Sequence, residues 1–112
     1  MHLTSTVKDN AIVVTVVDTR IDAAVAIKFK DSMRDETKEG PDRVILDMSN
    51  VDFVDSSGLG AIVAVMKLLK TGQLLELSGL TPTVDKVFRL TRMNSVFAIH
   101  LSVEEALASK AA

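Results

Sequence analysis

Residues 44–60 read VILDMSNVDFVDSSGLG, and this stretch indicates the class of fold. Val44 to Leu46 is apolar without interruption, which is typical of a strand in a parallel sheet that is covered on both faces. We expect Asp47 to Asp52 to form a polar connection and Phe53-Val54 to return to the core. Residues that favour the start of a helix follow, so the stretch predicts a strand and then a helix.

The predicted helix has a well-marked beginning. Asp55, Ser56 and Ser57 are all residue types that cap helices by accepting a backbone N–H, and the run from Leu59 to Lys70 follows them. Apolar residues within the run recur at helical spacing and predict one stripe that faces the core. The stripe consists of Leu59, Ile62, Met66 and Leu69.

Two strands and a helix are expected before this stretch. Leu3 to Val7 alternates apolar and polar residues like an edge strand, and Ala11 to Val17 is rich in β-branched residues. Because the connection between them is short, they should form an antiparallel hairpin. Asp22 is then expected to cap a helix whose apolar residues recur every fourth position, at Val25, Phe29 and Met33.

The remainder of the chain continues the alternation of strands and helices. Leu74 to Leu77 and Val96 to Ile99 are the expected strands, and Thr81-Pro82 and the capping box from Ser102 to Glu105 open the expected helices. The sequence therefore predicts one α/β domain over residues 1–112, with a mixed, mostly parallel sheet of about five strands and about four helices. An antiparallel hairpin opens this sheet.

Composition excludes several classes of function. The chain has 112 residues, a formal net charge of −2 and no cysteine. Disulfides and thiolate chemistry are therefore excluded, and direct binding to nucleic acid is disfavoured because it usually needs an excess of basic residues. The longest apolar run, Leu59 to Met66, is too short to insert across a membrane, which takes about 20 residues. These features lead us to expect a cytoplasmic protein.

Catalytic and cofactor motifs are also missing from the sequence. Val63 stands where a dinucleotide-binding loop beginning at Gly58 would need glycine, and no Walker loop is present. The two histidines, His2 and His100, have no acidic ligand at helical spacing, which argues against a metal site. We expect no enzyme activity and no cofactor.

Two carboxylates leave one alternative open. Asp47 and Asp55 each follow apolar strand residues, and paired acids at strand ends can bind Mg²⁺ and accept a phosphoryl group, as in receiver domains. The supporting acidic pair and the late lysine of such domains are missing, so the favoured interpretation is that both acids are caps or loop residues.

The segment from Asp55 to Gly60 has two features beyond a capped helix start. Glycine costs about 1 kcal/mol per helical position relative to alanine, so two glycines in the first turns indicate that something approaches closely. The helix is also apolar on nearly every side, which is typical of a helix that is either deeply buried or meets a partner, and in a small domain we expect part of it to be exposed. Its small residues, Ser57, Gly60, Ala61 and Ala64, are expected to share one face, and Val63, Val65 and Leu68 to lie outside the core stripe.

The same residues carry a family resemblance. The runs VILD at 44–47 and VDFVDSSGLG at 51–60 resemble the central motif of the STAS-domain anti-sigma factor antagonists. Residues 81–91 look like the third helix of that family, and residues 96–107 look like its last strand and helix. The resemblance covers nearly the whole chain, and its most specific part is DSSGLG at residues 55–60.

The resemblance implies a mechanism. In this family the unphosphorylated antagonist binds an anti-sigma factor that is also a serine kinase, and the sigma factor is released. The kinase phosphorylates the serine after the motif aspartate, here Ser56, and a PP2C-type phosphatase reverses the modification. Ser57 is the competing acceptor, although we expect it to line or cap the helix start. The residues expected to meet the partner are Asp22, Asp55, Ser57, Gly58, Leu59, Gly60, Ala61 and Ala64.

Two departures from the family put the identity of the partner in question. Thr19 and Arg92 stand where relatives often carry glycine, after the second strand and near the end of the third helix. The alternative function is a constitutive STAS-like accessory subunit of a membrane transport complex. A small phosphoryl-acceptor or hydrolytic enzyme is the third hypothesis.

Overall fold

The structure is a computed structural model that describes residues 1–109. A five-stranded sheet in the order β1-β2-β4-β6-β7 forms its centre, with β1 antiparallel to β2 and every other pair parallel. Its strands are β1 (Leu3–Lys8), β2 (Ala11–Val16), β4 (Arg43–Asp47), β6 (Leu74–Ser78) and β7 (Ala98–His100). The helices are α1 (Ala26–Thr37), α2 (Ser56–Leu68), α3 (Pro82–Leu90), the 3-10 turn η1 (Met93–Ser95) and α4 (Val103–Ala108). This architecture confirms the expected α/β class and the opening hairpin.

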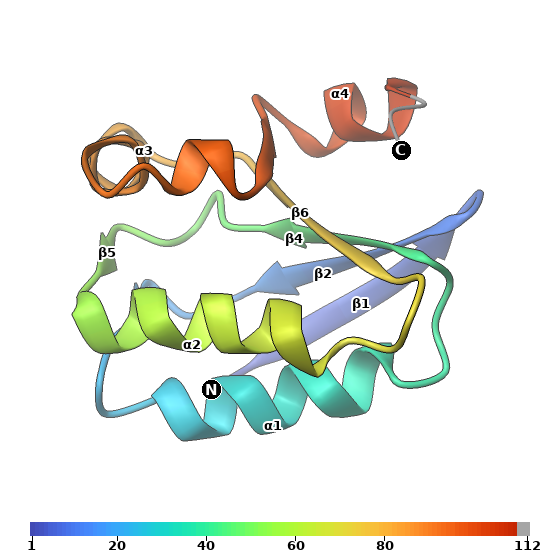
Figure 1. The fold of residues 1–112 in the computed structure, drawn as a ribbon, viewed down its shortest axis with the longest axis horizontal. Coiled ribbons are helices and arrows are strands. Elements are labelled where there is room, and N and C mark those ends of the chain that lie inside the picture. The colour runs from blue at the N-terminus through green and yellow to red at the C-terminus, as the bar shows by residue number, and fades with distance from the viewer. Residues whose placement is uncertain (110–112) are drawn as a thin grey trace.

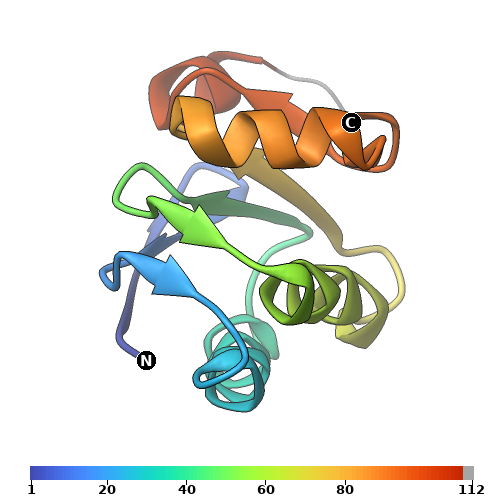
Figure 2. The ribbon, with the colours of Figure 1, turned by 90° about the vertical axis from the view of Figure 1, so that its left-hand side faces the viewer.

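The two faces of the sheet are covered unequally (Figures 1 and 2). Alternate strand residues such as Val14 and Leu46 point to the larger core, where they meet Phe29 of α1 and Ile62 of α2. This core also takes in α3, whose Phe88 packs edge-on against Phe97 at a centroid distance of 6.4 Å. The opposite face carries a smaller cluster made by Ala11, Val13, Ile45 and Ala106 of α4. The sequence pattern therefore predicted the buried strand β4 correctly, since all its apolar residues are fully buried.

A second, two-stranded sheet was not expected. It consists of β3 (Arg20–Ile21) and β5 (Phe53–Val54), paired in parallel with Ile21 opposite Val54. Ile21 and Val54 are buried, but the expectation that Phe53 enters the core is wrong, because this residue is 38% exposed. The Arg20 guanidinium lies 4.1 Å from the centre of that ring.

The expected role of Asp22 as a helix cap is also wrong. Helix α1 begins only at Ala26, and its N-cap residue Val25 makes no side-chain hydrogen bond. Asp22 instead accepts the backbone N–H of Ala24 at 3.1 Å and the Nε–H of Arg20 at 3.2 Å. Its carboxylate closes a tight turn before the helix, which is a common use of aspartate in loops.

Arg92 occupies the position where the family often has glycine, and the backbone shows why glycine suits it. Its φ of 61° and ψ of 22° are left-handed, which costs a residue with a Cβ about 1–2 kcal/mol. The Arg92 N–H donates to the carbonyl of Arg89. The Arg92 carbonyl accepts the backbone N–H and the side-chain hydroxyl of Ser95, so these bonds hold the turn after α3 in this conformation. The departure at Arg92 is therefore a local strain, and α3 still ends at Leu90.

This strain gives a testable prediction. Arg92→Gly should be more stable than Arg92→Ala by about 1 kcal/mol, because both variants lose the same side chain and only alanine keeps a Cβ in the left-handed region. Urea unfolding of both variants measures the difference. Equal stabilities, or a less stable glycine variant, would contradict the left-handed backbone at this position.

A buried ionic network supports the thinly covered face of the sheet. Arg43 forms two 2.7 Å hydrogen bonds to the Glu76 carboxylate and also donates to the carbonyls of Ala106 and Ser109 around α4. His100 lies 2.8 Å from the same carboxylate. Burial by itself raises the pKa of Glu76, but the hydrogen bonds from Arg43 and His100 outweigh it and hold the pKa below its ordinary value of 4.5.

The lowered pKa of Glu76 fixes the sign of a pH effect. The stabilisation by the ionised carboxylate is fully present above pH 4.5 and is lost as the pH falls below that value. Glu76→Gln should cost about 3 kcal/mol at neutral pH, because Arg43 is left without its partner, and the difference from the unmodified chain should shrink at pH 3.

Denaturant unfolding at both pH values measures the free energy of unfolding of each variant. Glu104→Gln is the control, because Glu104 is exposed. A Glu76→Gln penalty that stays the same at both pH values would refute the assigned direction.

Candidate functional site

The candidate site begins at Asp55, the N-cap residue of α2. One carboxylate oxygen accepts the backbone N–H of Gly58 at 2.8 Å, which confirms the predicted cap. The other oxygen accepts the backbone N–H of Ala23 at 3.2 Å. Asp55 therefore joins the start of α2 to the loop between β3 and α1, two segments that are far apart in the sequence but meet at one end of the molecule (Figure 2).

The paired-carboxylate alternative gains no support from the geometry. Asp47 accepts the Ser49 backbone N–H at 3.0 Å and the Thr15 hydroxyl at 3.3 Å, so both its oxygens are used in a strand-end turn. Asp55 likewise uses both oxygens within the chain. Among residues 1–109, no group of three or more His, Asp or Glu side chains is placed to hold a metal ion. Both acids thus act as cap and loop residues.

Ser56 and Ser57 are the first two residues of α2, and both are exposed. Asp55 supplies the side-chain cap, so Ser57 does not serve as one. Neither serine hydroxyl forms a hydrogen bond with another group among the described residues. Either hydroxyl is therefore accessible to a modifying enzyme, and geometry alone does not distinguish them.

The two glycines of the motif serve different purposes. Gly58 is buried, and a Cβ added there would lie 2.7 Å from the carbonyl carbon of Ile21 and closer still to its oxygen. The close approach at Gly58 is therefore made by β3 of the same chain, and the expectation that a partner requires it is wrong. Gly60 is exposed, and a Cβ there would meet nothing within 4 Å. Of the two motif glycines, Gly60 is the one that presents bare backbone to the outside.

The orientation of α2 differs from the predicted one by a partial rotation. The residues most deeply packed are Gly58, Ala61, Ile62 and Val65, whereas Leu59, Met66 and Leu69 are only partly buried. Ala61 was expected on the face of small residues that meets a partner, and Val65 was expected outside the core stripe. Both expectations are wrong, because both residues are buried. The rotation follows from the Gly58 contact, because a helix pressed against β3 at Gly58 turns the positions three, four and seven residues later inward.

A smaller outward face of α2 remains for a partner. It contains Ser57 and Gly60, which are exposed, and Ala64, which is partly buried. Arg20 and Phe53 lie beside this end of the helix, on the short β3–β5 sheet. Neither Arg20 nor Phe53 was predicted from the sequence. The available signal was that each directly precedes an apolar residue that is buried in the core.

The sequence model of the family described as "STAS domain" matches residues 3–106, which include every element from β1 to most of α4. The chain belongs to the STAS domain family. A protein of Bordetella bronchiseptica named "Putative anti-sigma factor antagonist BtrV" is 31% identical over 90 residues, which cover 80% of this chain and 78% of the relative.

Solved structures of STAS proteins share the fold over almost the whole chain. A structure from Thermotoga maritima, named as a putative anti-sigma factor antagonist, is 26% identical with a TM-score of 0.81, and the match covers 95% of this chain and 92% of that one. SpoIIAA in its unphosphorylated form is 21% identical with a TM-score of 0.72, covering 95% of this chain and 93% of SpoIIAA.

A third structure carries a different name. The sulfate transporter family protein of Wolinella succinogenes is 21% identical with a TM-score of 0.77 and covers 92% of this chain and 86% of that one. The shared fold alone therefore does not separate antagonists from transporter-associated domains. Within residues 1–109 the structure contains no helix that is both long and apolar enough to cross a membrane.

The two motif glycines allow a matched test of the geometry. Gly58→Ala should destabilise the STAS domain by about 3 kcal/mol or more, because the backbone of β3 cannot move away cheaply. Gly60→Ala should be neutral or stabilise by up to about 1 kcal/mol, because alanine favours the helix and the space is open. Chemical denaturation of both variants measures this. Similar behaviour of the two variants would show that α2 does not press against β3 at Gly58.

Proposed function

We propose that this STAS domain is an anti-sigma factor antagonist whose binding to an anti-sigma factor with serine kinase activity is abolished by phosphorylation of Ser56. The observation that carries the proposal is the exposed Ser56 at the first position of α2, directly after the N-cap Asp55 and beside the outward face of Ser57, Gly60 and Ala64. In this proposal a PP2C-type phosphatase restores the active form, and the domain acts in the cytoplasm, without a cofactor or enzyme activity of its own.

The fold is suited to carry a phosphate at this position. Phosphorylation adds a charge of about −1.5 to −2 and three acceptor oxygens. The first turn of a helix has backbone N–H groups without intrahelical partners and a favourable dipole, so a dianion at Ser56 is stabilised locally. The hydrogen bonds of Asp55 to Gly58 and Ala23 do not involve the Ser56 hydroxyl, so they persist when it is modified.

In the proposal, the phosphate weakens binding at the interface with the partner. On this proposal, a partner that packs on the small residues Ser57, Gly60 and Ala64 has room only for an unmodified serine beside them. A dianion there must be desolvated and displaces the partner sterically. A loss of about 3–4 kcal/mol corresponds to a two- to three-decade loss of affinity. Phosphorylation thus separates the two partners and leaves the domain folded.

Two other predicted residues take supporting roles in the proposal. Asp22 lies next to the site through Ala23, whose N–H binds Asp55, so it is close enough to contact a kinase that reaches Ser56. Leu59 is partly buried against the core, and Gly58 and Ala61 are buried, so these three shape the helix that the partner meets.

The binding experiment compares three variants. Ser56→Asp should weaken binding to the anti-sigma factor kinase about hundredfold or more, whereas Ser56→Ala should bind like the unmodified chain, since only the first adds charge at the interface. Thr83→Asp is the control, because Thr83 is an exposed residue in the first turn of α3 and receives the same charge at a helix start. Partners are captured from source cells, identified, and their affinities measured by calorimetry.

The outcomes separate the competing functions. Loss of a serine kinase from the Ser56→Asp capture, with thermal unfolding close to that of the unmodified chain, supports the proposal. Recovery of a transporter subunit that binds all variants equally would favour the accessory-subunit function instead. A phosphopeptide map with modification only at Ser57 would overturn the assignment to Ser56.

A further inference from the structure

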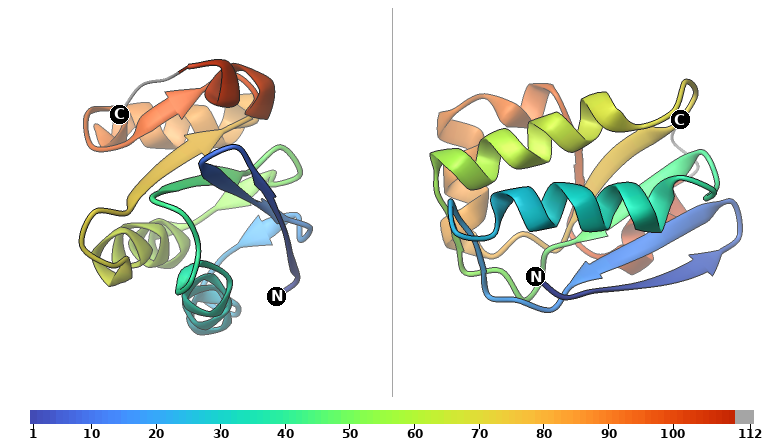
Figure 3. Two further views of the ribbon diagram at one scale, coloured as in Figure 1. Left: turned by 90° about the vertical axis from the view of Figure 1, so that its right-hand side faces the viewer. Right: turned by 90° about the horizontal axis from the view of Figure 1, so that it is seen from below.

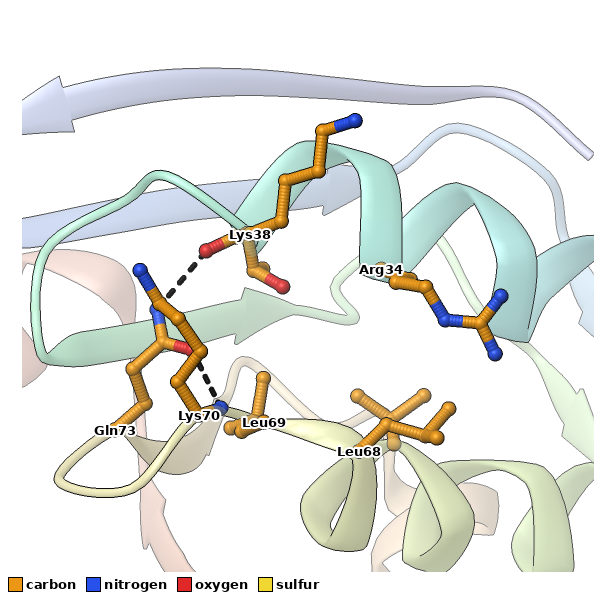
Figure 4. Close-up of a pocket in the computed structure, with 8 residues that line it drawn as sticks. Arg34, Lys38, Leu68, Leu69, Lys70 and Gln73 are labelled. Atoms are coloured by element: carbon orange, nitrogen blue, oxygen red, sulfur yellow. Dashed lines mark hydrogen bonds between the residues drawn. The ribbon is translucent and has the colours of Figure 1, made fainter.

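A second notable surface lies at the other end of α2, at its junction with the end of α1. A cavity of about 50 Å³ opens between the last turns of the two helices (Figure 4). Val65, Leu68 and Leu69 supply its apolar wall, and Leu68 is 44% exposed although it is a large apolar residue. We call this cavity and its rim the basic pocket, with Arg34, Lys38 and Lys70 as its rim.

The frame of the basic pocket is held by Gln73. Its side-chain amide donates to the carbonyls of Thr37 at 2.9 Å and Pro41 at 3.1 Å, and its side-chain oxygen accepts the Lys70 N–H at 3.0 Å. These bonds tie the end of α1 to the loop that follows α2. The amide of Gln73 is therefore fully used for structure, and the wall of the pocket is fixed before any partner arrives.

The charge of the basic pocket is unbalanced. None of the residues that line it is acidic, in a chain whose net charge is −2. Within residues 1–109, no carboxylate forms an ion pair with Lys38 or Lys70. Arg34 has one partner, Asp31, at 3.6 Å, and both side chains are more than half exposed, so this pair contributes little. Three cations thus line an apolar cavity, and within residues 1–109 the single carboxylate paired with any of them is the exposed Asp31.

Helix stabilisation accounts for only part of this arrangement. Cations near helix C-termini interact favourably with the helix dipole, which suits the positions of Arg34 and Lys38. The dipole gives no reason for the cavity between the helices or for the exposed Leu68 at its edge. A concave apolar site with a cationic rim is complementary to an apolar side chain that is flanked by carboxylates. A flat anionic lipid surface matches a concave site less well.

We propose that the basic pocket docks an acidic segment of the antagonist's protein partner, with one apolar side chain of that segment between Leu68 and Leu69 and its carboxylates at Arg34, Lys38 and Lys70. This inference rests on the proposed function, because it extends the same partner surface along α2. A helix of 13 residues is roughly 20 Å long, so the pocket and Ser56 touch different parts of the partner. The pocket selects the partner, and the phosphate at Ser56 releases it.

The test uses a defined probe. A short synthetic peptide with one leucine flanked on both sides by glutamates is titrated into the isotope-labelled chain and followed by amide NMR shifts. We expect shifts confined to Arg34, Lys38, Leu68, Lys70 and Gln73. Lys38→Glu combined with Lys70→Glu should weaken peptide binding about tenfold or more, because two attractions become repulsions. The control combination Lys28→Glu with Lys86→Glu changes the net charge equally at exposed lysines outside the pocket and should bind as the unmodified chain does.

Each other result overturns the inference. Scattered shifts, equal weakening in the control combination, or undiminished binding of a peptide with serine in place of leucine would exclude a docking pocket. Binding to phosphatidylserine vesicles in place of the peptide would assign the surface to a membrane. Thermal unfolding of all variants tests whether the cations only stabilise the helix ends. In that case the charge reversals lower the stability of the domain and leave peptide binding unchanged. Ser56→Asp should bind the peptide normally, so failure of the phosphate switch and failure of the pocket are seen separately.

Discussion

The carboxylate of Asp55 joins the start of α2 to the loop before α1, and the geometry of the candidate site depends on this junction. One oxygen accepts the Gly58 N–H and the other accepts the Ala23 N–H. Gly58 is then pressed against the backbone of Ile21 so closely that no side chain fits between them. The junction fixes both the position and the rotation of α2, and with them the residues that face outward.

Under the proposed function, this constraint allows phosphorylation of Ser56 to change binding without changing the fold. Gly58, Ala61 and Val65 face the core, so Ser57, Gly60 and Ala64 lie on the outward side of α2. Ser56 is exposed at the first position of the helix, where a phosphate is electrostatically favourable. At the far end of the same helix, Lys38 and Lys70 offer charge of the opposite sign. Helices α1 and α2 lie side by side (Figure 3). Under the proposed function, a partner that spans both ends of α2 meets a contact that Ser56 switches and a permanent contact at the basic pocket.

Sequence patterns predicted the long elements well and the short ones poorly. Continuous burial of Val44 to Leu46 and the cap at Asp55 are local properties, and both were read correctly. The β3–β5 pair could not be predicted by periodicity, since each strand has two residues and the pairing joins Ile21 to Val54 across the chain. The same pairing determines the environment of Gly58, so a contact within the chain was mistaken for a partner contact. Asp22 was misassigned because a turn and a helix cap use the same side-chain chemistry.

The most direct test of this account is the NMR spectrum and amide hydrogen exchange of the chain phosphorylated at Ser56. The account predicts shift changes limited to the first turn of α2 and the neighbouring loop at residues 22–25, with the Gly58 amide as well protected as in the unmodified chain. Loss of protection at Gly58, or exchange spreading into β3 and β5, would mean that the phosphate breaks the Asp55 junction and acts through the fold.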